Sequence, residues 1–167
     1  MSKALDMIAL KGALRAEIRQ RLRATSAEDL QSRSQIIRDR VLHLNVWKQA
    51  KRIVFFSPLP NEPDIAVLAQ LAAANAKTVA TIPSTARSEA DFELQEKSDL
   101  IFVPGLAFSQ DGHRLGRGAG FFDRLLAGRA ARAFKIGICF SFQLVDAIPI
   151  ERHDIEMDMI VTDEGIL

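Results

Sequence analysis

The sequence predicts an α/β protein with three layers, α/β/α, built on a mainly parallel β-sheet. Short apolar runs of four to six residues alternate with segments of helical periodicity, and several of these runs stop at proline or glycine. Uninterrupted apolar strands are typical of parallel sheets that are covered on both faces. The chain has 167 residues, 48% of them hydrophobic and 26% charged, which suits one ordinary domain. We therefore expect residues 1–167 to form a single domain.

The amino-terminal part of the chain predicts two helices. Leu14, Ile18 and Leu22 recur at helical spacing, which predicts an amphipathic helix over about the first twenty residues. Ser26 followed by Asp29 resembles an N-cap pair and marks the start of a second helix. The apolar face of this second helix is formed by Leu30, Ile37, Val41 and Leu44.

The remainder of the chain predicts five strands and two further helices. The expected helices run from Asp64, as N-cap, to about Asn75, and from about Phe121 to a C′ glycine at Gly128. A long loop is expected between Gly105 and Gly120. The expected strands are Arg52–Ser57, Lys77–Ile82, Leu100–Val103, Lys135–Phe140 and Met159–Thr162, with Asp91–Gln95 as an edge strand.

Composition excludes several classes of protein. The 22 basic and 21 acidic residues give a net charge of +1, which argues against a broad nucleic-acid surface. Cys139 is the only cysteine, so an internal disulfide is excluded and a reducing compartment is expected. No uncharged apolar run reaches the roughly 20 residues of a membrane span. These features predict a cytoplasmic protein without nucleic-acid or membrane partners.

Two loops leave the carboxyl ends of predicted strands, where open α/β sheets bind their ligands. One loop is Ser57–Asp64, and the other is Gly105–Gly120. Ligand-binding residues are therefore expected first in these two loops.

The second loop ends in glycines at alternate positions, 116, 118 and 120, directly before a predicted helix. Glycines accept positive φ angles that let successive N–H groups converge on an anion, and the start of the helix adds further N–H groups. One helix-dipole contact contributes only about 0.3–1 kcal/mol. Arg114 and Arg117 are therefore the added donors that a polyphosphate would require. A solvated glycine-rich loop remains the alternative.

Better-known phosphate motifs do not fit this loop. Phe121 stands where a dinucleotide fingerprint requires glycine, and the Lys-Ser/Thr pair of a Walker loop is absent. Asp123, in the first helical turn, suits either a helix N-terminus or a Mg²⁺ ligand. Asp158, before the last strand, is the candidate for a second metal-binding carboxylate. Each acid also fits an ordinary structural role.

Taken together, these residues resemble the 5-formyltetrahydrofolate cyclo-ligase (methenyltetrahydrofolate synthetase) family. The resemblance covers nearly the whole chain in order and implies a fold similar to that of sugar-phosphate isomerases and CoA transferases. The matching segments are Lys11–Arg15, Glu62, Asp99–Phe108 continued by Arg114–Asp123, and Gly137 through Phe142–Val145 to His153, Asp154 and Asp158.

The resemblance implies an enzyme that converts 5-formyltetrahydrofolate to 5,10-methenyltetrahydrofolate with ATP and Mg²⁺. The γ-phosphate passes to the formyl oxygen, and N10 then closes the ring. Arg114, Arg117 and Asp123 would be catalytic, Asp123 and Asp158 would hold Mg²⁺, and the protein is expected to act as a monomer. The pterin would contact Phe56, Ser57, Glu62 and Phe122. The phosphates would contact Lys11, Arg15, Arg114, Leu115, Gly116, Arg117, Gly118, Ala119, Gly120, Phe121 and Phe122.

Two departures from the family leave other functions open. Phe121 and Phe122 stand where relatives usually have tyrosines, and the chain contains no tyrosine. The stretch Ser84–Ser98 is shorter than in relatives, which predicts an enlarged or missing wall of the folate pocket. The alternatives are a divergent enzyme with a different small acceptor and a non-catalytic paralogue that binds nucleotide or folate.

Overall fold

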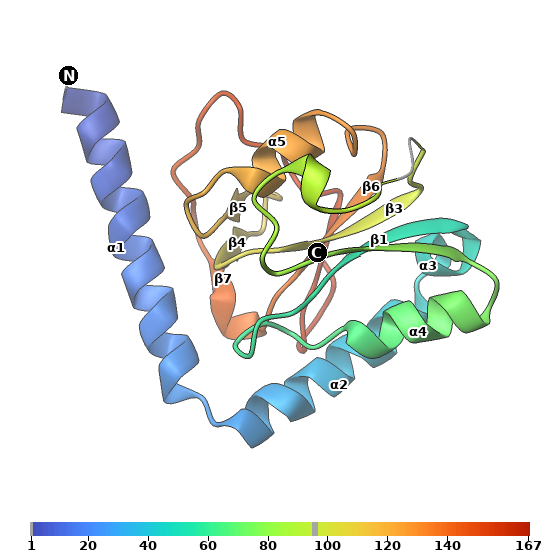
Figure 1. The fold of residues 1–167 in the computed structure, drawn as a ribbon. Helices are drawn as coiled ribbons and strands as arrows, with labels where there is room; N and C mark the ends of the chain where they lie inside the picture. The colour runs from blue at the N-terminus through green and yellow to red at the C-terminus, as the bar shows by residue number, and fades with distance from the viewer. Residues whose placement is uncertain (1, 95–96) are drawn as a thin grey trace.

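A computed structural model describes residues 2–94 and 97–167 and contains a five-stranded sheet at its centre (Figure 1). All four strand pairs of this sheet are parallel, which confirms the predicted mainly parallel architecture. In spatial order the strands are β2 (Thr78–Ile82), β1 (Arg52–Phe56), β3 (Leu100–Pro104), β6 (Phe134–Ile138) and β8 (Met159–Val161).

The strand order creates a crevice at one edge of the sheet. After β1 the chain adds β2 on one side, and it then returns to add β3 on the other side. Phe56 is level with Ile82, and Pro104 is level with Ile138, so the carboxyl ends of these strands share one edge. Connections that depart in opposite directions open a crevice between β1 and β3, which is the usual ligand position in such sheets.

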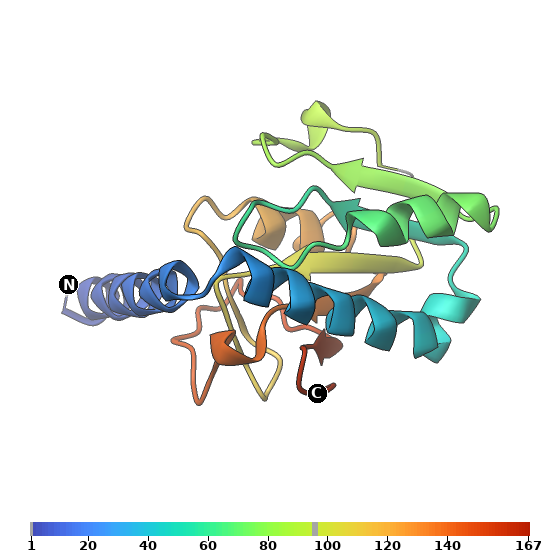
Figure 2. The same ribbon diagram turned by 90° about the horizontal axis from the view of Figure 1, so that it is seen from below.

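Helices cover both faces of the sheet (Figures 1 and 2). On one face, Trp47, Phe55 and Phe102 pack as a ring cluster, with 5.1 Å between the Phe55 and Phe102 centroids. On the other face, Leu125 and Leu126 join a second buried apolar cluster. This arrangement confirms the three predicted layers. The first face is covered by α2 (Ala27–His43), α3 (Asn45–Gln49) and α4 (Ala66–Ala74), and the second by α5 (Phe121–Ala127).

The first helix, α1 (Ser2–Ala24), stands beside the sheet instead of covering one of its faces (Figure 1). Its carboxyl-terminal half buries Ile18 and Leu22, whereas Leu5 and Ile8 in the other half are 60% and 68% exposed. No helix in the described part of the chain is long and apolar enough to cross a membrane.

A second, three-stranded sheet lies against α1, and two of its strands fall in the segment where the sequence predicts only a long loop. Its strands have two or three residues, too few for hydrophobic periodicity to identify them. The order is β5 (Arg114–Leu115), β4 (Ala107–Ser109) and β7 (Leu144–Val145), and a short 3₁₀ helix, η2 (Ser141–Gln143), precedes β7.

Local hydrogen bonds explain which helix boundaries were predicted correctly. The Ser26 hydroxyl accepts from the Asp29 N–H at 3.2 Å, as expected for the start of α2. Asp64 is not the cap of α4, because Ile65 holds that position. The Asp64 carboxylate instead accepts from the Ala66 N–H at 3.0 Å, which forms a turn before the helix. Gly128 ends α5, as expected, but it is the C-cap residue, with φ −105°, and not the C′ residue.

The predicted edge strand Asp91–Gln95 is also wrong within the described residues, and Gln95 lies outside them. Glu89–Asp91 forms a 3₁₀ turn, η1, and Phe92–Leu94 is not a strand. The Asp91 carboxylate accepts from the backbone N–H groups of Arg87 and Ser88 at 2.6 and 2.8 Å. Such local bonds compete with a strand ladder and favour a turn. They also lower the pKa of Asp91.

Candidate active site

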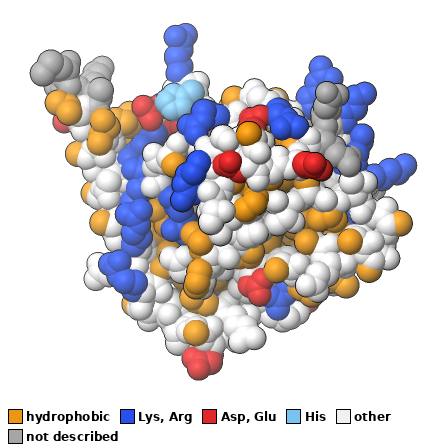
Figure 3. Space-filling view, in the orientation of Figure 1, with side chains coloured by type: hydrophobic (Ala, Val, Ile, Leu, Met, Phe, Trp, Pro, Cys, Tyr) orange, Lys and Arg blue, Asp and Glu red, His pale blue; other side chains and the backbone are white. Residues whose placement is uncertain are grey.

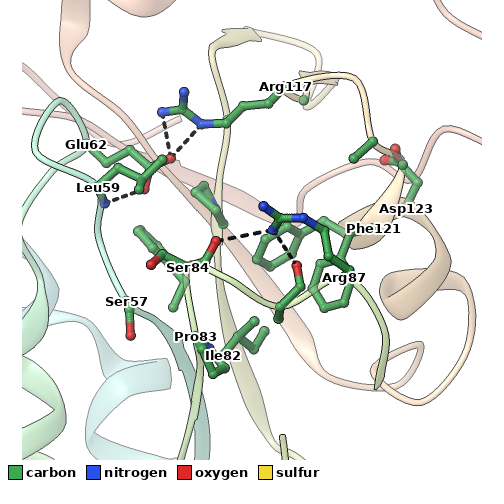
Figure 4. A pocket seen from close by; sticks show the side chains of 18 of the residues that line it. Ser57, Leu59, Glu62, Ile82, Pro83, Ser84, Arg87, Arg117, Phe121 and Asp123 are labelled. Carbon is green, nitrogen blue, oxygen red and sulfur yellow. Dashed lines mark hydrogen bonds and ion pairs between the residues drawn. The ribbon is translucent and has the colours of Figure 1, made fainter. Parts of the chain in front are cut away.

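A cavity of about 410 Å³ opens at the carboxyl edge of the sheet, in the crevice between β1 and β3 (Figure 4). Both loops that the sequence analysis singled out contribute to its lining. The residues that line it are Phe56, Ser57, Leu59, Glu62, Ile82, Pro83, Ser84, Ala86, Arg87, Pro104, Gly105, Arg114, Gly116, Arg117, Ala119, Gly120, Phe121, Phe122 and Asp123.

The glycines of the loop serve two different purposes. Gly118 and Gly120 have φ angles of +115° and +66°, in the region that disfavours side chains. Gly116 does not have a positive φ, so the expectation of three such glycines is wrong at this position. Gly116 is small for another reason, because a Cβ there would lie 2.9 Å from a guanidinium nitrogen of Arg114. The Arg114 guanidinium therefore packs directly against the backbone of the loop at Gly116.

Arg114 and Asp123 form an ion pair at the wall of the cavity. The Arg114 side chain is only 4% exposed and that of Asp123 is 25% exposed. The guanidinium also donates to the Pro104 carbonyl at 3.3 Å and lies 5.8 Å from the centroid of the Phe122 ring. Its Nε is buried and has no hydrogen-bond partner among the described residues. This arginine is thus fixed in place, and two of its five N–H donors have hydrogen-bond partners among the described residues.

A second ion pair joins Arg117 of the glycine loop to Glu62 of the loop after β1 (Figure 4). The Arg117 Nη2 and Nε atoms donate to Glu62 Oε1 at 2.9 and 3.1 Å, and Nη2 also reaches Asn61. Glu62 Oε2 accepts from the Leu59 N–H at 2.9 Å, and the Glu62 side chain is 6% exposed. A residue expected to contact phosphate and one expected to contact the pterin are therefore direct partners.

Lys11 and Arg15, the two α1 residues expected to contact phosphate, do not line the cavity. Arg15 Nε donates to the Gly116 carbonyl at 2.9 Å and so supports the glycine loop from outside. Lys11 Nζ lies 2.7 Å from Glu151 and 3.2 Å from Asp154. Burial opposes the charged form of Lys11, but the hydrogen bonds to both acids outweigh it and raise its pKa. Lys11 thus ties α1 to the loop before β8.

His153 approaches the same two acids as Lys11, and the ligand atoms of Glu151, His153 and Asp154 lie within 4.8 Å of one another. The Lys11 ammonium is already paired with both carboxylates of this group. A metal ion bound by these residues would have to displace the ammonium.

Asp158 is not brought together with Asp123. It precedes β8, at the amino edge of the sheet, whereas the cavity lies at the carboxyl edge. Its carboxylate accepts from the Lys135 backbone N–H at 2.7 Å and lies 3.9 Å from the Lys135 ammonium. Leu115 also lies away from the cavity, because its side chain is 2% exposed and belongs to the core.

The wall that the short Ser84–Ser98 stretch was expected to lose is present. Ser84, Ala86 and Arg87 line the cavity, and the Phe92 ring packs edge-on against Phe121 at 6.1 Å. A wall is therefore present here, whereas the alternative of an enlarged pocket stays a prediction. Arg87 was not among the predicted site residues, although its place shortly after a strand that ends at Ile82 indicates the ligand-binding edge.

Basic side chains gather along α1 and on the neighbouring face (Figure 3). Arg15 in this group contacts the glycine loop, and Arg114, Arg117 and Arg87 line the cavity. A chain with a net charge of only +1 therefore concentrates cations around one site. Such clustering attracts anionic ligands without making the whole surface basic.

Comparisons with known proteins agree with this architecture. The model of the 5-formyltetrahydrofolate cyclo-ligase family matches residues 7–92 and 76–163. The 5-formyltetrahydrofolate cyclo-ligase of Mus musculus is 26% identical over an alignment of 198 residues. The alignment covers 97% of this chain and 98% of the relative.

Two solved structures share the fold. The 5,10-methenyltetrahydrofolate synthetase of Aquifex aeolicus is 25% identical with a TM-score of 0.79, covering 94% of this chain and 91% of its own. The Mycoplasma pneumoniae synthetase is 28% identical with a TM-score of 0.76, covering 92% and 98%. The matches span the sheet, the glycine loop and α1 together, and this chain therefore belongs to the 5-formyltetrahydrofolate cyclo-ligase family.

Proposed function

We propose that this protein converts 5-formyltetrahydrofolate to 5,10-methenyltetrahydrofolate and hydrolyses ATP to ADP and phosphate in the process. Family membership supports the reaction class. The observation that carries the proposal is the convergence of the glycine loop, Arg114, Asp123 and Glu62 on one cavity. The cavity combines donors for a polyphosphate with an acceptor for a heterocycle.

The glycine loop and Arg114 would bind the phosphates of ATP. Phosphoryl transfer depends mainly on positioning and charge neutralisation, with little covalent chemistry from the protein. Arg114 suits this role because Asp123 and Pro104 hold its guanidinium in one position before the ligand arrives. Its remaining guanidinium N–H groups would be available to phosphate oxygens without breaking an existing hydrogen bond.

Asp123 would also provide the protein ligand of Mg²⁺. Magnesium binds one or two carboxylates and completes its octahedral shell with water and phosphate oxygens. Asp123 fits this requirement because it lines the cavity and is partly exposed beside the glycine loop. When bound, the ion would neutralise charge on the phosphates. Asp158 has no part in this proposal because it lies at the opposite sheet edge.

Glu62 would accept hydrogen bonds from the N–H groups of the pterin, beside Phe56 and Ser57. Its carboxylate is buried and its direction is fixed by the Leu59 N–H. The ion pair with Arg117 also holds the Glu62 carboxylate before the substrate arrives. Arg117, with 35% of its side chain exposed, can then turn toward the phosphates. This exchange would link folate binding to completion of the phosphate site.

A direct assay tests the proposal. Incubation with 5-formyltetrahydrofolate and MgATP should raise the absorbance of the methenyl product, and it should release one phosphate per product formed. Reactions without ATP, and with EDTA in place of Mg²⁺, serve as controls. An absence of product from protein that binds MgATP would contradict the proposed reaction.

A second candidate is an enzyme with the same nucleotide site and a smaller acceptor. The short Ser84–Leu94 segment favours it, because Phe92 packs against Phe121 of α5 and Ser84, Ala86 and Arg87 of this segment line the cavity. A panel of small formamides and carboxylates, assayed for ATP-dependent phosphate release, separates the two candidates. Release with a panel member but not with the folate would support the smaller acceptor.

A further inference from the structure

We infer that Arg87 is an additional substrate-contacting residue whose guanidinium binds the γ-phosphoryl group of ATP. The inference rests on the proposed function and deepens it, because it assigns a role in phosphoryl transfer to a residue outside the glycine loop. Arg87 belongs to the segment that follows β2. None of the motifs that carry the resemblance to the family lies in this segment.

The three arginines that line the cavity differ in how their charges are neutralised. Arg114 is paired with Asp123, and Arg117 is paired with Glu62. Arg87 has no carboxylate within ion-pair distance in residues 2–94 and 97–167; backbone hydrogen bonds lower the pKa of the nearby Asp91, and the Arg87 charge adds to this effect. Within the described residues, its guanidinium donates to backbone carbonyls of its own loop, at 3.0 Å to Ala86 and 3.5 Å to Ser84. Arg87 is therefore the cavity cation that most readily accepts an anionic ligand.

The backbone of Arg87 is held in place although its side chain is exposed. The Asp91 carboxylate accepts the backbone N–H groups of Arg87 and Ser88. One residue further on, Phe92 packs against Phe121 at the start of α5. These contacts fix the loop to the same element that follows the phosphate-binding glycines. Because this backbone is already ordered, little backbone conformational entropy is lost when the guanidinium binds a ligand there.

The position of Arg87 favours a phosphoryl group over the pterin. Figure 4 shows Arg87 beside Phe121, whereas Glu62 and Arg117 occupy another part of the cavity. A guanidinium presents a planar set of donors that suits phosphate oxygens. The pterin end of the substrate offers N–H donors to Glu62 and no anion to an arginine. The ligand of Arg87 is therefore assigned to the nucleotide.

During transfer, a bond forms between the formyl oxygen and the γ-phosphorus as the bond from that phosphorus to the β-phosphate oxygen breaks. ADP leaves with the electron pair of the broken bond. Arg87 moves no proton, because guanidinium remains protonated in proteins. It would stabilise the charge on the equatorial oxygens of the transferred group. Its contribution should therefore depend on the presence of the third phosphate.

The test compares the binding of MgATP and MgADP, measured by titration calorimetry without folate. We expect Arg87→Gln to raise the Kd of MgATP by about 10- to 100-fold, the usual range for one lost charge-assisted bond. The Kd of MgADP should stay within about twofold. Arg87→Lys retains the charge and should give an intermediate effect. Arg132→Gln, which removes an exposed arginine outside the cavity, is the matched control.

The outcomes separate this inference from the proposed function. An unchanged MgATP affinity in folded Arg87→Gln, or equal weakening for both nucleotides, would overturn the role of Arg87. A rise only in the KM for folate would place a substrate carboxylate there and would also overturn it. Wild-type protein that binds MgATP but yields no methenyl product refutes the proposed reaction, while the nucleotide comparison still decides Arg87. Wild-type protein that binds no MgATP refutes both.

Discussion

Replacing Asp123 by asparagine should destabilise the protein as well as impair its activity, because Asp123 neutralises a buried arginine. Removing one partner of a fully buried ion pair costs about 3–5 kcal/mol, whereas exposed pairs contribute about 0–1 kcal/mol. The Arg114 side chain is 4% exposed but that of Asp123 is 25% exposed, and the Pro104 carbonyl still accepts from Arg114. An intermediate loss of about 2 kcal/mol is therefore expected.

For a chain of this length, that loss corresponds to a fall in Tm of roughly 4–8 °C. Thermal and urea unfolding of Asp123→Asn, Arg114→Met and the double variant measure the coupling between the two residues. Asp146→Asn, an exposed acid outside the cavity, is the matched control. If Asp123→Asn melts with the wild type, or if the two single effects simply add, the ion pair does not stabilise the site as argued.

Three further predictions address other parts of the molecule. Gly118→Ala should weaken MgATP binding about tenfold, because a residue with a side chain disfavours a φ of +115°. The control Gly12→Ala, inside α1, should leave MgATP binding unchanged. Equal effects of the two substitutions would contradict a conformational role for Gly118. Glu62→Gln should raise the KM for folate about tenfold without raising the KM for MgATP, because it weakens the hold on Arg117. Steady-state kinetics with equal increases in both KM values would refute the assignment of Glu62 to the pterin. Burial opposes ionisation of Asp99, but hydrogen bonds from Arg52 and neighbouring backbone N–H groups outweigh it and lower the pKa. Since a lowered pKa stabilises the fold above the unfolded value, the difference in unfolding free energy between wild type and Asp99→Asn should be constant above about pH 5 and shrink below about pH 4. A difference that grows in acid would contradict this sign.

The main elements of the fold could be predicted because their signals are local. The apolar run ending at Phe56 and the helical spacing of Ile18 and Leu22 correspond to β1 and α1. The small sheet could not be predicted in this way, because its two- and three-residue strands depend on pairing between distant segments. The prediction of an edge strand after β2 was wrong for a different reason, because the Asp91 carboxylate accepts nearby backbone N–H groups and stabilises a turn.

The residues of the candidate site likewise fall into those that are neighbours in sequence and those that only the folded chain brings together. The glycine loop, Arg114 and Asp123 are neighbours in sequence, so their proximity could be expected. The pairing of Glu62 with Arg117 joins residues 55 positions apart and required the tertiary structure. Asp158 shows the reverse case, since its acidic character suits a metal ligand but its strand begins at the wrong edge of the sheet.

By itself, the sequence determined the parallel α/β architecture, the glycine loop and membership of a folate-related family, because apolar periodicity and contiguous motifs are carried by the order of residues. Only the tertiary structure decided which charges neutralise one another and which side chains face the cavity. Those properties depend on the direction of each strand and on contacts between distant segments. For this reason Arg87 emerges as a candidate ligand-binding residue from its place in the folded chain, where the other cavity arginines already have carboxylate partners.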